Sequence, residues 1–170
     1  MIETRQRDDA MTGRSADNAG VLVHPPLLYL GAVALGFALD AVLPLRFAPS
    51  GLGDGLQYGL GGALIVLALA ILTAAARQFR RVNTSLPTNR PTTALVTTGL
   101  YAYSRNPIYI SLSLCQAGIA VAADRLWILL LLAPVLLVMR YGVIAREERY
   151  LEGKFGRAYT DYKARVRRWL

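Results

Sequence analysis

Leu126-Trp-Ile-Leu-Leu-Leu-Leu-Ala-Pro-Val-Leu-Leu-Val-Met-Arg-Tyr-Gly-Val-Ile144 is the stretch that decides the class of fold, because it is long and apolar enough to cross a bilayer. Crossing the ~30 Å hydrocarbon layer takes about 20 residues, with about 17 as a workable minimum. The 170-residue chain is 54% hydrophobic, and its apolar residues gather in this stretch and three others, Leu27 to Leu45, Leu56 to Ala76 and Ile108 to Ala123. We therefore predict an all-α, polytopic membrane protein with about four transmembrane helices.

The basic residues are distributed as in a membrane protein rather than a nucleic-acid-binding one. The formal net charge is +8, and the connection between the second and third spans holds Arg77, Arg80, Arg81, Arg90 and Arg105 without an acidic residue. The two short connections carry one Arg each. The positive-inside rule then predicts that both termini and the long middle loop are cytoplasmic. The compact form of the Gly99–Tyr109 motif favours a bacterial inner membrane, with an intracellular eukaryotic membrane as the alternative.

The ends of the chain and its cysteine content set further expectations. Residues 1–20 are polar and predicted to be a disordered tail, because they have little apolar surface to offset the entropy of ordering. A signal peptide is not expected, and residues 21–170 are predicted to form a single domain. Cys115 is the only cysteine and lies inside the third span, so a cysteine cluster for a metal is excluded.

The last third of the chain is predicted to hold a helical hairpin followed by an amphipathic helix. Only Asp124 and Arg125 separate the third and fourth spans, and Pro134 is expected to kink the fourth. After Glu148, apolar residues recur at helical spacing among basic ones: Leu151, Phe155, Tyr159, Tyr162, Val166 and Trp169. This pattern predicts an interfacial helix on anionic lipid, or alternatively a helix that binds a peripheral partner.

Two polar clusters stand at ends of predicted spans, on the same side of the membrane. The first is Thr98-Gly-Leu-Tyr-Ala-Tyr-Ser-Arg-Asn-Pro-Ile-Tyr-Ile110, and the second is Arg146-Glu-Glu-Arg149. Polar side chains near membrane depth are costly unless they are satisfied, so we expect the clusters to form one site for a polar ligand and an apolar partner. Arg140 precedes Glu147 by seven residues and is predicted to share its helical face.

Each cluster also has a purely structural interpretation. Asn106-Pro107 is ordinary chemistry for the start of a helix. Adjacent Glu147 and Glu148 can form a solvated, salt-bridged face, and Arg140 can reach to the membrane interface.

The order and spacing of these motifs resemble a known group of proteins. Gly99-Leu-Tyr-Ala-Tyr-Ser-Arg-Asn-Pro-Ile-Tyr109, a two-span hairpin, Glu147-Glu148, Phe155-Gly156 and Tyr159-x-x-Tyr162 resemble the isoprenylcysteine carboxyl methyltransferase and phospholipid methyltransferase families. The resemblance covers roughly residues 83–170. Asn106 stands where the commoner form has His, Ser111 where Gly is frequent, and Leu100 where Pro is frequent.

This resemblance implies an integral membrane enzyme that uses S-adenosylmethionine in a cytosolic pocket, formed mainly by residues 83–170. Cofactor-binding roles are implied for five positions: Arg105, Asn106, Pro107, Tyr109 and Glu148. We further predict that Glu147 and Arg140 act in catalysis, Glu147 beside the charged cofactor and Arg140 on an anionic group of the acceptor. The expected acceptor is lipophilic or lipid-anchored and offers a carboxylate, a thiol or an amine; no obligate protein partner is evident.

Two other functions remain open at this stage. A membrane reductase would bind a nicotinamide cofactor instead of S-adenosylmethionine. A non-catalytic interaction module would depend on the basic residues Arg165, Arg167 and Arg168 rather than on Glu147 and Glu148.

Overall fold

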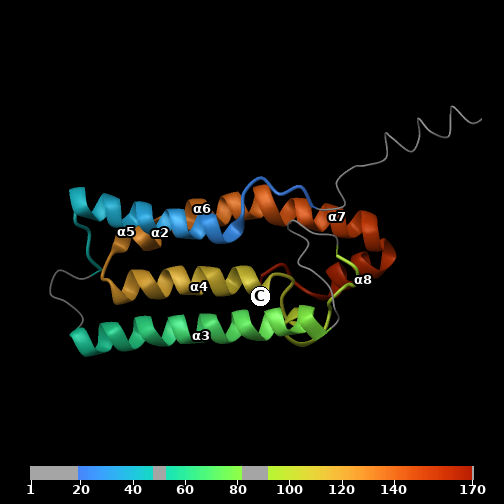
Figure 1. Ribbon diagram of the computed structural model, residues 1–170, viewed down its shortest axis with the longest axis horizontal. Coiled ribbons are helices and arrows are strands. Elements are labelled where there is room, and N and C mark those ends of the chain that lie inside the picture. Colours follow the sequence, from blue (N-terminus) through green and yellow to red (C-terminus); the bar gives the residue numbers. More distant parts are fainter. Residues whose placement is uncertain (1–18, 48–52, 82–91, 170) are drawn as a thin grey trace, which may run out of the picture.

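The computed structural model describes residues 19–47, 53–81 and 92–169 (Figure 1). The regular secondary structure of these residues is helical throughout, which confirms the predicted fold class. Residues 1–18 of the predicted tail and residues 82–91 of the long middle connection lie outside the described part.

Nine elements follow one another in the described residues. The first half contains α2 (Pro25–Val42) and α3 (Asp54–Arg81), and a 3-10 turn, η1 (Gly99–Ala102), precedes α4 (Pro107–Ala122). The remaining elements are α5 (Leu126–Leu130), α6 (Leu132–Val138), the π-helix η2 (Met139–Ile144), α7 (Ala145–Phe155) and α8 (Arg157–Arg165).

Apolar helices occur at the four predicted spans and in the predicted order, and three of them are long enough to cross a membrane. Pro25–Val42, Asp54–Arg81 and the composite helix Leu126–Phe155 are long and apolar enough to cross a membrane. Helix α4 is also apolar but has 16 residues, which at 1.5 Å per residue gives about 24 Å. The third predicted span is thus the shortest, as its sequence indicates.

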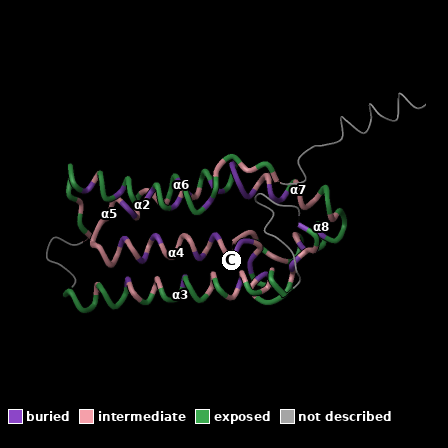
Figure 2. Tube along the Cα trace, viewed as in Figure 1, coloured by how far each residue is buried: buried purple, intermediate pink, exposed green. Residues whose placement is uncertain are grey.

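Helix α4 is the centre of the bundle. In Figure 1 it runs between α3 on one side and α2 with α5 and α6 on the other. Figure 2 shows buried and intermediate positions along α4, whereas much of α3 is exposed, as expected for helices at the centre and the edge of a bundle. The polar elements η1, α7 and α8 gather at the end of the bundle where α4 begins.

Glycines allow α3 and α4 to pack backbone against backbone. A Cβ atom added to Gly61 would lie 2.6 Å from the backbone nitrogen of Ala122, and one added to Gly118 would lie 2.9 Å from the carbonyl oxygen of Gly61. Small residues permit such close helix contact in membrane bundles. At Gly61 the glycine-rich start of the second span therefore admits the neighbouring helix.

The fourth span is a helix with two irregular turns. The first lies at Leu131, between α5 and α6, because Pro134 has no N–H to donate to the carbonyl of Leu130. The second is the π-helix η2, whose wider turns change the register of the residues that follow. Arg140 is consequently exposed while Glu147 is buried, so the prediction that these two residues share a helical face was wrong.

Ion pairs link the helices at the end of the bundle away from α7. The buried carboxylate of Asp40 forms ion pairs with Arg125 and, at 3.9 Å, with Arg46. The backbone N–H of Leu45 donates to the same carboxylate at 3.1 Å. Asp40 therefore lies at the end of the bundle that carries the short connections, away from α7.

The amphipathic region after Glu148 forms two helices instead of one. Gly156 has φ +52°, a left-handed conformation that ends α7 and redirects the chain into α8. Tyr159 and Tyr162 on the apolar face of α8 are buried within the protein. The amphipathic pattern is confirmed, and these two tyrosines pack against protein.

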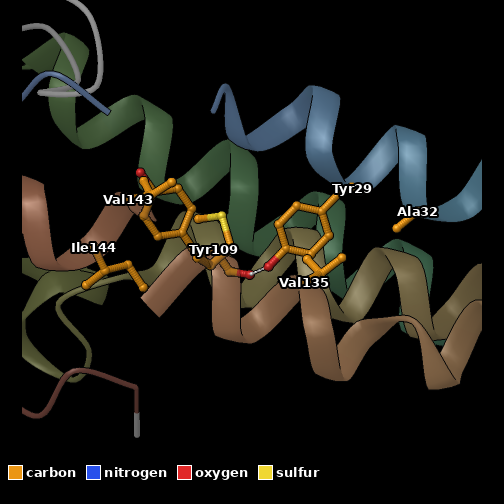
Figure 3. Packing of buried hydrophobic residues seen from close by; sticks show 7 residues of the cluster. Tyr29, Ala32, Tyr109, Val135, Val143 and Ile144 are labelled. Atoms are coloured by element: carbon orange, nitrogen blue, oxygen red, sulfur yellow. Dashed lines mark hydrogen bonds between the residues drawn. The ribbon is translucent and has the colours of Figure 1, made fainter. Parts of the chain in front are cut away.

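A buried cluster joins α2, α4 and the fourth span next to the polar end. Figure 3 shows Tyr29 of α2 directed at Tyr109 of α4, where the Tyr29 hydroxyl lies 3.5 Å from the Tyr109 carbonyl oxygen. The same hydroxyl lies 2.8 Å from that of Ser113. Val143 and Ile144 complete the cluster from η2, so the packing that holds α4 extends up to the polar residues.

Candidate active site

The start of α4 brings a polar loop against the last described residues of the chain. Asn106 occupies the N-cap position and Pro107 the first turn, yet the side chain of Asn106 makes no capping hydrogen bond. Its Nδ2 instead donates to the carbonyl oxygen of Arg168 at 2.9 Å. The helix start is ordinary in its backbone, but the amide side chain of Asn106 is used for a long-range contact.

Glu148 receives two guanidinium groups. Nε and Nη2 of Arg168 donate to the two carboxylate oxygens at 3.0 and 2.7 Å, which is a bidentate pair. Nη1 of Arg105 lies 2.9 Å from Oε1 of the same carboxylate. These contacts compensate a carboxylate that burial would otherwise strongly penalise.

Glu147 turns to α4. The hydroxyl of Tyr109 donates to its carboxylate, at 2.7 Å from Oε1 and 2.8 Å from Oε2. Glu147 and Glu148 are each 6% exposed. The interpretation of the two acids as a solvated helix face is therefore wrong, because both are buried and bound to residues from the first polar cluster.

The tyrosines of α8 close the cluster on its outer side. The hydroxyl of Tyr162 donates to the carbonyl oxygen of Tyr101 in η1 at 2.7 Å. Burial and the nearby charge of Glu148 raise the pKa of Tyr159 to about 12. Burial also raises the pKa of Tyr101 and Tyr162, and the Tyr162 phenol is protonated as the donor of its hydrogen bond at neutral pH.

Arg140 lies apart from the carboxylate cluster, on an apolar groove. The groove has a volume of about 430 Å³ and runs between α4 and α6, with Leu114 and Leu136 among its walls. Arg140 of η2 and Trp169 also line it. The volume falls within the ~300–1,000 Å³ typical of small-molecule sites.

Of the seven predicted site residues, the structure brings six into or next to one buried cluster: Arg105, Asn106, Pro107, Tyr109, Glu147 and Glu148. Arg140 is separate from them and faces the groove. Arg168 and Trp169 were missed as site residues. The sequence predicts them on an amphipathic helix because of their basic and aromatic side chains. The helix instead ends before Val166, whose backbone is extended, and nothing in the local pattern indicates this.

Comparisons with known proteins identify the family of the chain. The family model described as phospholipid methyltransferase matches residues 56–158, more than half of the chain. A 35-residue segment is 60% identical to an uncharacterised protein of Haemophilus influenzae; the match spans 21% of this chain and 56% of that protein. No solved structure matches the chain.

Proposed function

Because the chain belongs to the phospholipid methyltransferase family, we propose that it transfers a methyl group from S-adenosylmethionine to a lipophilic acceptor at the cytosolic end of a membrane-spanning bundle. The observation that carries this proposal is the pair of buried carboxylates, Glu147 and Glu148, beside an apolar groove. The cluster offers carboxylates for the ammonium and sulfonium of such a cofactor and guanidinium groups for its carboxylate. The proposed membrane is a bacterial inner membrane with both termini cytoplasmic.

The donors and acceptors of the cluster fit such a cofactor. Glu147 and Glu148 can accept from its amino group, and Arg105 can hold its carboxylate. Nε of Arg105 is buried and has no hydrogen-bond partner among the described residues, so the cluster retains an unused donor. Asn106 and Tyr109 supply neutral polar groups, while Pro107 fixes the start of α4 on which both stand.

The chain contributes positioning and the exclusion of water. When bound, the cofactor supplies an electrophilic methyl group, so the protein needs to align a nucleophile with it and keep water away. The tyrosines Tyr101, Tyr159 and Tyr162 are buried, as are the two carboxylates, which suits a site that excludes water. No proton transfer to Glu147 is required when the acceptor is already a carboxylate or thiolate.

The groove between α4 and α6 is the proposed site of the acceptor's hydrocarbon part. Its walls are apolar and belong to helices of the bundle, so a lipid can enter it from the bilayer. Arg140 in its lining favours an acceptor that bears a carboxylate or phosphate.

Calorimetric titration with S-adenosylhomocysteine tests the cofactor site in detergent-solubilised protein. We expect saturable binding that is lost in Glu147→Gln/Glu148→Gln. Glu152→Gln is the matched control, because Glu152 stands on the same helix but pairs with Lys163 outside the cluster. Folded protein that binds NADPH and not S-adenosylhomocysteine would support the reductase alternative instead.

The test of the interaction-module alternative should leave Arg168 unchanged. Arg168 is ion-paired with Glu148, so a variant of Arg168 would disturb both proposed functions. Arg165 and Arg167 are exposed and suit the comparison better. If Arg165→Gln/Arg167→Gln abolished function while Glu147→Gln/Glu148→Gln did not, the methyltransferase proposal would be wrong.

A further inference from the structure

The last four described residues, 166–169, do not continue α8 but return to the start of α4. Val166 has an extended backbone, with φ −114° and ψ 130°. The trace ends beside the first turn of α4 in Figure 1. We call these residues the 166–169 segment.

Main-chain contacts fix the position of this segment. The backbone N–H of Arg105 donates to the carbonyl oxygen of Arg167 at 3.0 Å. The carbonyl oxygen of Arg168 accepts from Nδ2 of Asn106 at 2.9 Å and from the hydroxyl of Ser104 at 3.3 Å. Three consecutive residues before α4 thus bind two consecutive carbonyls of the segment.

The two side chains that follow enter different parts of the site. Arg168 forms the bidentate pair with Glu148 described above. Trp169, the next residue, packs against the cluster that contains Tyr109 and Val143 and lines the apolar groove with Arg140. One peptide unit therefore links a contact to the buried carboxylate with a wall of the groove.

We propose that Arg168 is a positioning residue for Glu148 and that Trp169 is a binding residue of the groove, so that the 166–169 segment couples the cofactor site to the acceptor site. This inference rests on the proposed function. Glu148 retains Arg105 when Arg168 is removed, but it loses the bidentate contact that fixes the direction of both carboxylate oxygens. Any movement of Glu148 on binding a ligand then changes the position of Arg168 and, through it, of Trp169.

The tryptophan content of the chain makes this coupling measurable. The two tryptophans are Trp127 and Trp169, and Trp127 lies at the far end of the bundle, where its indole N–H donates to the carbonyl oxygen of Leu43. Trp127→Phe leaves Trp169 as the only indole fluorophore. We expect S-adenosylhomocysteine to change the emission of Trp169 in this variant with the same dissociation constant that calorimetry gives.

Variants of Arg168 test its positioning role. In the Trp127→Phe background, Arg168→Ala is expected to weaken S-adenosylhomocysteine binding by about 10-fold or more, as for a lost charge-assisted hydrogen bond, and to abolish the emission change. Arg168→Lys should recover part of the affinity, and the exposed Arg165→Ala should bind like the parent. Thermal unfolding of each variant shows whether it is folded.

A brominated fatty acid tests the groove, because bromine quenches a tryptophan that it contacts. We expect 9,10-dibromostearate to quench Trp169 saturably, and Ala117→Leu, which fills the groove lining, to reduce the quenching. Bound S-adenosylhomocysteine should shift the half-saturating concentration of the fatty acid. If this shift disappears in Arg168→Ala, the result supports the coupling.

Three results would overturn the inference. One is an unchanged affinity for S-adenosylhomocysteine in folded Arg168→Ala, and another is an emission of Trp169 that does not respond although calorimetry detects binding. The third is the absence of quenching by the brominated fatty acid. A wild-type protein that fails to bind S-adenosylhomocysteine by calorimetry contradicts the proposed function itself, which distinguishes that failure from the first two.

Discussion

The hydroxyl of Tyr109 donates to the carboxylate of Glu147 from 38 residues away, at 2.7 Å from Oε1 and 2.8 Å from Oε2. Both residues are buried, and they belong to α4 and α7, the two helices that carry the separate sequence motifs. This contact is one of the points at which the first motif meets the second. Its neighbour on α7, Glu148, makes the corresponding contact with Arg105.

Tyr109→Phe removes this donor and leaves the ring in place. We expect the affinity for S-adenosylhomocysteine to fall about 10-fold and the free energy of unfolding to fall by about 1–3 kcal/mol, because a buried carboxylate loses a hydrogen bond. Calorimetry and thermal unfolding in detergent measure the two effects. Tyr103→Phe is the control, since Tyr103 is 77% exposed; equal losses in the two variants would contradict the assigned role.

Gly61→Ala tests the close packing of α3 on α4. The added methyl group would lie 2.6 Å from backbone and side-chain atoms of Ala122, so the helices must separate. We expect a destabilisation of about 1–3 kcal/mol, the usual cost of overpacking, and a lower midpoint of thermal unfolding.

Gly62→Ala is the matched control for this variant. A Cβ atom at Gly62 meets nothing within 4 Å, and alanine is favoured over glycine in a helix by roughly 0.5–1 kcal/mol. Gly62→Ala should therefore be neutral or stabilising. A Gly61→Ala protein as stable as Gly62→Ala would show that the contact is not close in solution.

The elevated pKa of Tyr159 predicts alkaline destabilisation. The unfolded chain loses this phenolic proton near pH 10, whereas the folded protein holds it to about pH 12, so the unfolded state is favoured progressively as the pH rises from 10 to 12. The slope is about 1.4 kcal/mol per pH unit for one proton. Below pH 10 the contribution is fully present.

Denaturant titrations at pH 9, 10, 11 and 12 measure this effect. Tyr159→Phe should lose less stability over the upper part of this range than the wild type, because it has no phenol to ionise. Tyr103→Phe serves as the exposed control and should follow the wild type. Parallel pH profiles for all three proteins would show that Tyr159 does not contribute.

The sequence predicts the bundle well because apolar length and charge distribution are local properties. The positions of the spans, the short connection at Asp124 and Arg125 and the proximity of the two motifs all follow from such properties. The π-helix η2 does not follow from them, and Val143 and Ile144 within it belong to the buried cluster with Tyr109. The shared face expected for Arg140 and Glu147 failed for that reason.

The end of α8 was difficult to predict for a different reason. Val166 and Trp169 continue the helical spacing of Tyr159 and Tyr162, so the apolar pattern gives no sign that the helix stops. The chain leaves the helix to make tertiary contacts, chiefly the hydrogen bonds from Arg105 and Asn106 and the ion pair of Arg168 with Glu148. Tertiary contacts of this kind override local propensity. They join residues far apart in the sequence, so the local pattern of residues does not reveal them.

The separation of Arg140 from the carboxylates predicts a division between acceptor and cofactor binding. Arg140 lines the groove, whereas Glu147 and Glu148 are bound by Tyr109, Arg105 and Arg168. Arg140→Glu should therefore weaken quenching of Trp169 by 9,10-dibromostearate, since a carboxylate next to the anionic headgroup repels it. The affinity for S-adenosylhomocysteine should stay within about 2-fold, because surface charge changes away from a site contribute little.

Arg140→Lys, which keeps the charge, should retain most of the quenching. If the fatty acid bound Arg140→Glu as tightly as the wild type, Arg140 would not select anionic acceptors, and if S-adenosylhomocysteine binding collapsed instead, Arg140 would belong to the cofactor site.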